Sequence, residues 1–251
     1  MRRVILSAAE IARENSRLEA ATPEERLAFA VERFGDKLLF TSSFGAGSAV
    51  LLHLWSQVAK NLPVIFLDTG FLFDETLRYK DDLAQQLGLN VKTVKPEPTR
   101  EAFLAEHGAD IQQTNSDFCC SVNKVAPLAP LLQMADAWVS GLRRDQSETR
   151  KNTPILLPTA RDEGQGSYLK AHPLATMTGD EVVEYMQKFS LPEHPLRAKR
   201  FLSIGCAPCT RAVEEGEDER AGRWAGSTKT ECGLHARALQ QTAAVGSGTS
   251  S

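Results

Sequence analysis

The sequence predicts an α/β protein with a doubly wound, mostly parallel sheet that carries helices on both faces. Short apolar segments alternate with longer segments of helical periodicity, and this alternation is typical of parallel sheets. The most distinctive polar motifs directly follow predicted strands, at the edge of the sheet where ligands bind in this architecture. A chain of 251 residues with 42% apolar residues can build one large domain and an appendage.

The chain begins with two predicted helices. The stretch MRRVILSAAEIAREN is apolar only briefly before Glu10 and Arg13 interrupt it, which favours an amphipathic helix over a signal peptide. Residues 22–34 have apolar positions at helical spacing and start with TPEE, a typical helix N-terminus. We therefore expect a helical segment over residues 1–35.

Strands and helices alternate in the next part of the chain. Residues 38–41 predict a strand, SSFGAGS a turn, and residues 49–60 a helix with an apolar face. LPVIFLDTG predicts a buried strand, and residues 75–87 predict a helix that ends at Gly88. NVKTVKP predicts a third strand, residues 101–107 a helix, and AWVSGLRRDQS a fourth strand that leads into a basic loop.

The composition changes after about residue 200, where glycine and charged residues become frequent and periodicity is weak. We therefore expect an α/β domain over residues 36–210 that ends in a cysteine hairpin, and a mobile tail over residues 211–238. The last stretch, residues 239–251, contains AAVGSGTSS and is expected to be disordered.

The overall charge and hydropathy exclude two classes of function. The 29 basic and 32 acidic residues give a net charge of -3, whereas a general nucleic-acid binder carries a basic excess. No apolar run is long enough to span a membrane. We expect a cytoplasmic protein whose thiols are normally reduced.

The turn SSFGAGS is a candidate phosphate-binding loop. The hydroxyls of Ser42, Ser43 and Ser48 and the backbone amides around Gly45 and Gly47 precede a predicted helix, whose N-terminus attracts anions. The motif matches neither a Walker A loop nor a dinucleotide-binding fingerprint. An ordinary tight turn is the alternative interpretation.

The motif GLRRDQSETR is a candidate oxyanion-binding loop. It places Arg143, Arg144 and Arg150 just after a predicted strand, and guanidinium groups bind phosphate and sulfate oxygens in pairs. A solvated charged loop is the alternative, but the position at the ligand edge of the sheet favours binding.

Four of the five cysteines form two pairs, namely the adjacent Cys119 and Cys120 and the CxxC pair Cys206 and Cys209. Four thiolates can bind zinc or an iron–sulfur cluster. Adjacent cysteines reach one zinc ion poorly, whereas each can bind a different iron of a cubane, so the pattern favours a [4Fe–4S] cluster without excluding zinc. The other interpretation of the adjacent pair is that it is simply buried on a helix.

The fifth cysteine, Cys232, is a candidate nucleophile. It lies alone in the glycine-flanked motif ECGLH, and a cationic neighbourhood would favour its thiolate form at neutral pH. A spare surface cysteine is the alternative. The basic side chains near it in sequence are Arg220, Arg223, Lys229, His235 and Arg237.

Together, these motifs and LDTG resemble the assimilatory adenylylsulfate (APS) reductases, a branch of the sulfonucleotide reductases in the PP-loop adenine-nucleotide superfamily. The resemblance extends over residues 38–235. It implies a PP-loop fold and the reduction of APS to sulfite and AMP with electrons from thioredoxin, in sulfate assimilation and cysteine biosynthesis.

The resemblance also implies roles for individual residues. Cys232 attacks the sulfate sulfur, expels AMP and becomes an S-sulfocysteine that thioredoxin then attacks, while Lys124 and His235 assist. The two cysteine pairs hold a [4Fe–4S] cluster, and Lys124 lies between cluster and substrate. The implied substrate-binding residues are Ser42, Ser43, Phe44, Gly45, Asp68, Thr69, Gly141, Arg143, Arg144, Arg150, Arg220 and Arg223.

Three alternatives stay open at this point. A reductase of 3′-phosphoadenylylsulfate (PAPS) is the nearest, although such relatives commonly lack both cysteine pairs. A PP-loop ATP pyrophosphatase, such as a tRNA-thiolating enzyme, is more distant because SSFGAGS is not an SGGxDS-like loop. A nucleotide-binding regulatory module with a metal site would not need a lone Cys232. Relatives are often homodimers or homotetramers, and the sequence does not fix the assembly.

Overall fold

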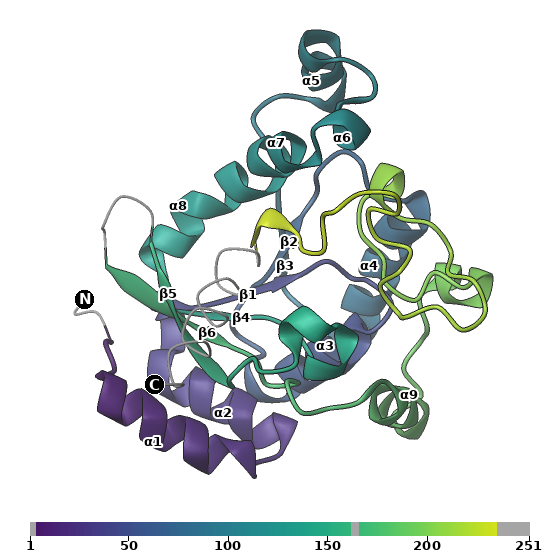
Figure 1. Cartoon of the computed structure of the whole chain (residues 1–251). Coiled ribbons are helices and arrows are strands. Elements are labelled where there is room, and N and C mark those ends of the chain that lie inside the picture. Colours follow the sequence, from purple (N-terminus) through teal and green to yellow (C-terminus); the bar gives the residue numbers. More distant parts are fainter. Residues whose placement is uncertain (1–3, 162–165, 235–251) are drawn as a thin grey trace, which may run out of the picture.

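The computed structural model describes residues 4–161 and 166–234, which form a six-stranded sheet with helices on both faces (Figure 1). The strands are β1 (Leu38–Ser42), β2 (Val64–Leu67), β3 (Val91–Val94), β4 (Ala137–Val139), β5 (Leu156–Ala160) and β6 (Ser167–Ala171). The helices are α1 (Ala8–Glu19), α2 (Pro23–Phe34), α3 (Ser48–Val58), α4 (Asp74–Leu87), α5 (Arg100–His107), α6 (Ile111–Thr114), α7 (Ser116–Cys120), α8 (Ala126–Met134) and α9 (Gly179–Lys188).

The strand order β3-β2-β1-β4-β6-β5 confirms the predicted doubly wound, mostly parallel sheet. β1 pairs in parallel with β2 on one side and β4 on the other, so that Phe40 lies opposite both Val64 and Val139. Only β5 is antiparallel among the described strands. From β1 the chain first adds β2 and β3 on one side of the sheet and then adds β4 on the other side. The strand order therefore reverses between β1 and β4, and the crevice where such folds bind ligands lies at the carboxyl ends of these two strands.

Alternate residues of β1 face two different cores. Leu38 and Phe40 pack with residues of α1, α2, α3, α4 and α9 in the larger core. Leu39 belongs to the smaller core on the opposite face, together with Leu128 of α8 and Trp138 of β4. The middle of the sheet is thus buried on both faces, which explains why β1, β2 and β4 are short, mostly apolar runs in the sequence.

Local sequence signals account for most helix boundaries. α2 begins after Thr22 because the threonine side chain accepts a hydrogen bond from the Glu25 amide, while the Glu25 carboxylate accepts one from the Thr22 amide. α4 ends at Gly88, which has a φ of 62°. None of the helices within residues 4–161 and 166–234 combines the length and apolarity needed to cross a bilayer.

The N-terminal helices are fixed to the domain by Arg26, whose side chain is buried. Its guanidinium group donates hydrogen bonds to the carbonyls of Leu18, Glu19 and Pro173, and to the Thr176 hydroxyl. This group therefore ties α1 and α2 to the segment that follows β6.

Replacing Arg26 with methionine is expected to lower the free energy of unfolding by about 3 kcal/mol, because several buried carbonyls would lose their donor. Urea denaturation would measure the change. Arg33→Met, an exposed position on the same helix, is the matched control and should change stability little. Equal stability of the Arg26 variant and the wild type would contradict this role.

The buried His172 side chain is expected to make the folded protein less stable in acid. Its ring is buried, Nδ1 lies 2.9 Å from the Pro154 carbonyl, and Nε2 has no hydrogen-bond partner among the described residues. Burial lowers the pKa of His172 to about 3, against about 6.5 in an unfolded chain. Between these values the unfolded state binds the extra proton, so the contribution to stability is complete above pH 6.5 and is lost as the pH falls.

We therefore expect the free energy of unfolding to fall by about 2 kcal/mol between pH 7 and pH 5 through this residue. Urea denaturation of His172→Gln at both pH values should show a decrease in the free energy of unfolding that is smaller than that of the wild type by about 2 kcal/mol. His107→Gln, a change on the outlying helix α5, should keep the wild-type pH dependence. An unchanged pH dependence in His172→Gln would exclude this explanation.

Candidate active site

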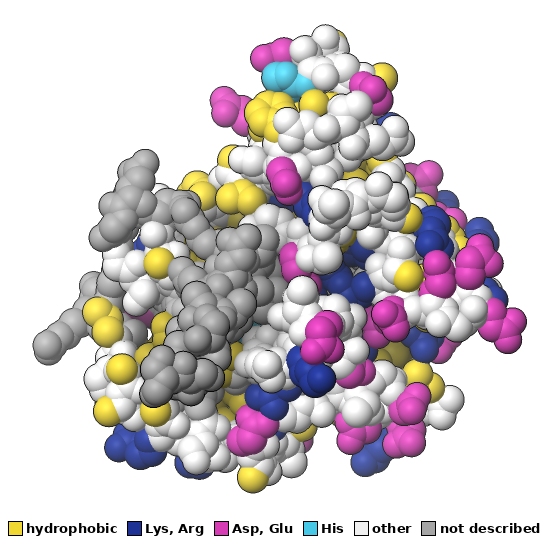
Figure 2. Space-filling view, viewed as in Figure 1, with side chains coloured by type: hydrophobic (Ala, Val, Ile, Leu, Met, Phe, Trp, Pro, Cys, Tyr) yellow, Lys and Arg dark blue, Asp and Glu magenta, His cyan; other side chains and the backbone are white. Residues whose placement is uncertain are grey.

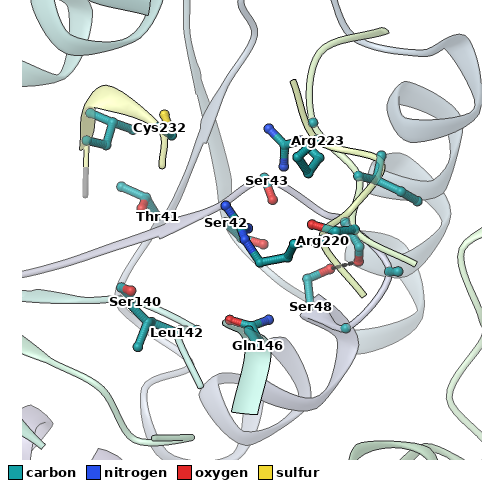
Figure 3. A pocket seen from close by; sticks show the side chains of 18 of the residues that line it. Thr41, Ser42, Ser43, Ser48, Ser140, Leu142, Gln146, Arg220, Arg223 and Cys232 are labelled. Carbon is teal, nitrogen blue, oxygen red and sulfur yellow. Dashed lines mark hydrogen bonds between the residues drawn. The ribbon is translucent and has the colours of Figure 1, made fainter. Parts of the chain in front are cut away.

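A pocket of about 250 Å³ opens at the carboxyl ends of β1 and β4. Figure 2 shows dark blue Lys and Arg atoms in the hollow at the centre of this face. The pocket is lined by the SSFGAGS loop, the start of the GLRRDQSETR loop and the segment that leads to Cys232 (Figure 3). The predicted placement of these motifs at one edge of the sheet thus brings them around one cavity.

The SSFGAGS loop turns sharply between β1 and α3. The Ser42 hydroxyl accepts a hydrogen bond from the Phe44 amide at 3.1 Å, and the Ser48 hydroxyl donates to the Gly45 carbonyl at 2.7 Å. α3 begins at Ser48, so its positive N-terminus faces the pocket. The loop and the helix terminus together form a site suited to an anion or a nucleotide phosphate.

Three of the predicted substrate-binding residues lie outside the pocket lining. The Phe44 ring is fully buried and packs edge-on against Phe66. Asp68 accepts a hydrogen bond from the Gly70 amide and pairs with Lys95. Arg144 pairs with Glu19 and so holds the end of α1.

Nine of the predicted substrate-binding residues do line the pocket. They are Ser42, Ser43, Gly45, Thr69, Gly141, Arg143, Arg150, Arg220 and Arg223. The arginines differ in their partners. Arg143 is already paired with Asp145 at 2.9 Å and with Glu219 at 2.7 Å, so acidic residues neutralise it within the fold.

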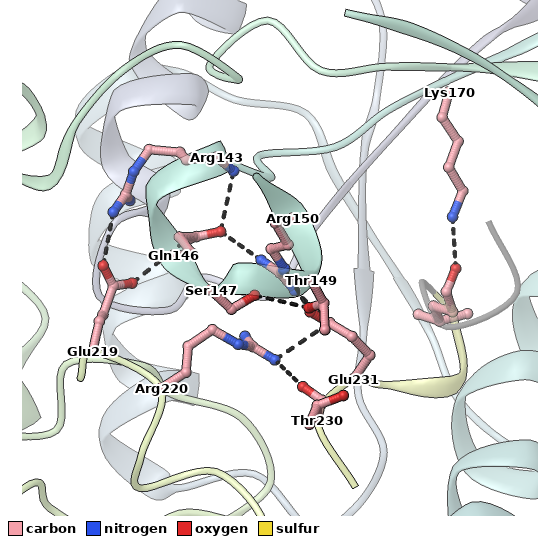
Figure 4. A network of polar contacts seen from close by, with 11 residues as sticks. Arg143, Gln146, Ser147, Thr149, Arg150, Lys170, Glu219, Arg220, Thr230 and Glu231 are labelled. Carbon is pink, nitrogen blue, oxygen red and sulfur yellow. Dashed lines mark hydrogen bonds and ion pairs between the residues drawn. The ribbon is translucent and has the colours of Figure 1, made fainter. Parts of the chain in front are cut away.

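Glu231 connects two other pocket arginines to the chain segment next to Cys232 (Figure 4). Its carboxylate accepts hydrogen bonds from Arg150 Nε at 2.7 Å and Nη2 at 2.6 Å, and from Arg220 Nη2 at 3.3 Å. Burial raises the pKa of Glu231, but hydrogen bonding to Arg150 together with the charges of Arg150 and Arg220 holds it below its usual value.

Lys124 and Arg223 are pocket cations with no carboxylate partner among the described residues. The Arg223 guanidinium lies over the Trp224 ring, 4.4 Å from its centroid, and against Gly205, where any Cβ would collide with it. These two charges therefore remain available for an anionic ligand.

The charge of Lys124 is maintained by the thiols around it. Burial alone would lower the pKa of Lys124, but electrostatic interaction with the neighbouring thiols of Cys206, Cys232 and Cys120 raises it above its usual value. The ammonium group is thus protonated at neutral pH. It lines the pocket together with Cys232.

Cys232 lies in the pocket wall (Figure 3), and hydrogen-bond donors and cations act on its sulfur. A hydrogen bond with Cys120 lowers the pKa of Cys232 well below its ordinary value, and burial opposes this effect. Lys124, the Leu234 amide and Arg223 lower it further. The site thus favours a thiolate at a position that faces the cavity. The predicted assisting residue His235 lies outside the described residues.

Three of the other four cysteines lie near one another, whereas Cys120 forms a hydrogen bond with Cys232. Cys119 and Cys206 belong to one apolar cluster, and Cys209 packs against it. Burial raises the pKa of Cys119 and of Cys209, and the neighbouring Cys206 thiol adds to both effects. Within the described part of the chain, no three Cys, His, Asp or Glu side chains converge as ligands of a single metal ion.

The predicted tail packs over the pocket in the structure. The Arg211 amide donates to the Gly222 carbonyl, and the Trp224 amide donates to the Cys209 carbonyl, which closes the cysteine hairpin. The Lys229 ammonium lies 3.5 Å from the Cys120 sulfur and 2.8 Å from an Asp117 carboxylate oxygen. The mobility of this segment stays a prediction, and residues 239–251 lie outside the described residues.

Comparisons with known proteins identify the family. A model of the phosphoadenosine phosphosulfate reductase domain matches residues 37–212, which is most of the chain. The chain belongs to this family. Relatives of the chain include the adenosine 5′-phosphosulfate reductase of Mesorhizobium japonicum, 45% identical over 84% of this chain and 81% of the relative. The protein of that name from Streptomyces coelicolor is 44% identical over 87% of this chain and 90% of the relative.

Solved structures show the same fold. A crystal structure of the phosphoadenylyl-sulfate (PAPS) reductase from Candida auris in complex with phosphate superposes with a TM-score of 0.71 at 25% identity, and covers 84% of this chain and all of that one. The Candida glabrata FMN adenylyltransferase in complex with FAD and inorganic pyrophosphate shares only the fold, with a TM-score of 0.52 at 16% identity over 98% of this chain and 86% of that one. The PP-loop architecture expected from the motifs is thus confirmed.

The structure of this family member adds pocket residues that the sequence did not suggest. Ser140 and Leu142 flank the predicted residue Gly141 in the loop after β4 and also line the pocket. Their position next to Gly141 in the sequence could therefore have identified them. Gln146 and Glu219 meet only through folding, with the Gln146 amide 3.3 Å from the carboxylate. Trp224 also lines the pocket, and its tail position gave no indication of this.

Proposed function

We propose that this protein reduces APS to sulfite and AMP, with Cys232 as the nucleophile. One observation carries the proposal: the Cys232 thiol faces the same cavity as the anion-binding SSFGAGS loop and the cations Lys124 and Arg223. The relatives named adenosine 5′-phosphosulfate reductase, at 40–45% identity, support the substrate and the place in sulfate assimilation. The cytoplasm is the expected compartment for such a thiol enzyme.

The proposed reaction has two steps. The Cys232 thiolate attacks the sulfur of APS, forms an S–S bond to the sulfonate group, and the S–O bond to AMP breaks. A thiolate of reduced thioredoxin then attacks the Cys232 sulfur, and sulfite leaves with the electron pair of the S–S bond. The second thioredoxin thiol resolves the mixed disulfide, which restores Cys232 and leaves oxidised thioredoxin.

The chain's cations support the first step. The negative charge on the leaving AMP and on the sulfonate oxygens grows as the S–O bond breaks, and Lys124 and Arg223 are free to stabilise it. Thr69 lines the same wall, and its hydroxyl lies 3.3 Å from the Cys206 sulfur. The cavity is walled by the sheet edge and the tail, which limits competing attack by water.

We also propose that Cys119, Cys120, Cys206 and Cys209 hold a [4Fe–4S] cluster. The donor set fits in kind, because three of the thiols gather in one apolar cluster, Cys120 directly follows Cys119 in the chain, and the Lys229 ammonium lies against the Cys120 sulfur. When bound, the cluster would supply a cross-link between these segments and a charge next to Lys124. Cys120 would then have no proton to donate, so that Lys124, the Leu234 amide and Arg223 would keep the Cys232 thiolate stabilised.

The substrate assignment is tested by incubating the purified protein with APS and with PAPS, each with reduced thioredoxin, and measuring sulfite. We expect sulfite from APS at a higher kcat/KM than from PAPS. The PAPS arm is necessary because the matching family and the Candida auris structure carry the phosphorylated substrate in their names. Absence of sulfite with both substrates, together with cleavage of ATP to AMP and pyrophosphate, would refute the reductase proposal.

The cluster is tested on protein purified without oxygen. We expect a brown preparation with about four iron and four sulfide per chain, and loss of this absorbance in Cys119→Ser or Cys206→Ser. Cys232→Ser is the matched cysteine control and should keep the colour. A colourless protein with stoichiometric zinc would refute the cluster assignment.

A further inference from the structure

We propose that Glu231 and Lys170 are positioning residues that hold the segment around Cys232 closed over the pocket, one on each side of the nucleophile. Neither side chain lines the cavity within the described part of the chain, so neither is placed to touch the substrate. The inference rests on the proposed role of Cys232 as the nucleophile. It assigns these two side chains to the placement of the thiol and not to the chemistry.

Glu231 holds the chain immediately before Cys232. Only 7% of Glu231 is exposed, and its two carboxylate oxygens meet Arg150 Nε at 2.7 Å and Nη2 at 2.6 Å. Such a paired contact between a guanidinium group and a carboxylate fixes orientation as well as distance. Because Arg150 lies in the connection between β4 and β5, this contact links the tail to the loop that joins these two strands.

The hydrogen bonds of Arg150 show that it serves the tail more than the pocket. Its Nε and Nη2 donate to Glu231, and its Nη1 donates to Gln146. Arg220 differs, because it uses Nη2 alone for the Thr230 carbonyl and the Glu231 carboxylate. We therefore assign Arg150 to the tail, while Arg220 is shared between the tail and the pocket that it lines.

Lys170 holds the chain just after Cys232. It is only 1% exposed, and its ammonium group donates a hydrogen bond of 2.8 Å to the Leu234 carbonyl (Figure 4). The ammonium group also lies 4.4 Å from the centroid of the Trp138 ring. A buried lysine is costly unless it is paired, and here the partner is a backbone oxygen of the tail.

The two contacts leave little freedom to the residue between them. Cys232 follows Glu231 directly and precedes Leu234 by two residues, so both ends of a very short span are fixed. The proposed reaction needs this placement for attack on sulfur and then needs the thiol to become accessible to thioredoxin. One ion-pair cluster and one hydrogen bond are enough to hold the thiol in place for attack on the substrate. They can still be broken when the thiol has to reach thioredoxin.

Hydrogen–deuterium exchange and single-turnover kinetics of Glu231→Gln and Lys170→Met would test the proposal. We expect the amides of residues 219–234 to exchange at least about tenfold faster in both variants, with the sheet unchanged. Formation of S-sulfocysteine on Cys232 from APS, measured by mass spectrometry, should be about 10- to 100-fold slower. Release of sulfite from the preformed adduct by reduced thioredoxin should be as fast as in the wild type or faster.

Two matched controls separate the role of these contacts from general effects of charge. Glu217→Gln removes a carboxylate that pairs with Arg211 on the same segment but away from the cavity. Lys188→Met removes an exposed lysine that lies over the Phe189 ring, as Lys170 lies over Trp138. Both controls should match the wild type in exchange and in adduct formation.

Each outcome is decisive. Unchanged exchange of residues 219–234 in both variants would overturn the proposal, and so would faster exchange with an unchanged rate of adduct formation. Faster exchange across the whole sheet would show a general structural role and would also overturn it. If the wild type forms no adduct with APS, the proposed function fails, while the exchange experiment still decides whether these residues hold the tail.

Discussion

Replacing Cys232 with serine should abolish the release of sulfite from APS. A hydroxyl has a far higher pKa than a thiol, so the variant would have no anionic nucleophile in the cavity. We expect the rate to fall by on the order of 10⁴-fold or more, as when an enzyme loses its attacking group. The measurement is sulfite production with reduced thioredoxin, together with mass spectrometry for the S-sulfocysteine adduct.

The Cys232→Ser variant should still bind nucleotide. The SSFGAGS loop and the positive end of α3 lie on another wall of the pocket and do not depend on the thiol. Equilibrium binding of AMP to the variant, compared with the wild type, is therefore the control. Sulfite production near the wild-type rate would show that another group carries the reaction.

Replacing Lys124 with glutamine should slow the reaction by about 10²–10³-fold, the loss typical when a donor to developing negative charge is removed. Interaction with the thiols around it raises the pKa of Lys124 and keeps it protonated, and no carboxylate among the described residues competes for its charge. The effect should appear in the single-turnover rate of adduct formation, because the charge develops as AMP leaves.

Lys95→Gln is the matched control for Lys124. Lys95 pairs with Asp68 beyond the end of β3, is largely exposed and does not line the pocket. Its replacement should leave the adduct rate unchanged. If Lys124→Gln altered only KM and left the single-turnover rate intact, Lys124 would bind substrate without stabilising the transition state.

The sequence was sufficient to predict the fold where hydrophobic patterns and turn residues agreed. β1, β2 and β3 and the helices that follow them were predicted because β1 and β2 are apolar runs and each of the three strands ends at a recognisable turn or proline. β5 and β6 were not predicted. Pro158 interrupts β5, and the charged Lys170, which is buried in the fold, gives β6 the sequence pattern of a surface segment.

The candidate site was predictable only in part, for a similar reason. Residues of SSFGAGS and GLRRDQSETR share short motifs, and their position after strands placed them at one sheet edge. Glu231 meets Arg150 across 81 residues of sequence, and Lys170 meets the Leu234 carbonyl across 64. No local pattern encodes such pairs, because they depend on how the tail returns over the sheet.

The helix that carries the adjacent cysteines contains a change of phase. Between α7 and α8, residues Ser121–Val125 form a π-helical turn, which is wider than an α-helical turn. An α-helix turns by about 100° per residue. Removing one residue from this turn would therefore rotate α7 by about that angle relative to α8. The wide turn therefore lets Cys119 face the Cys206 loop while Leu128 faces the sheet. Deleting Ser121 would break that alignment while keeping Lys124 and all the cysteines in the chain.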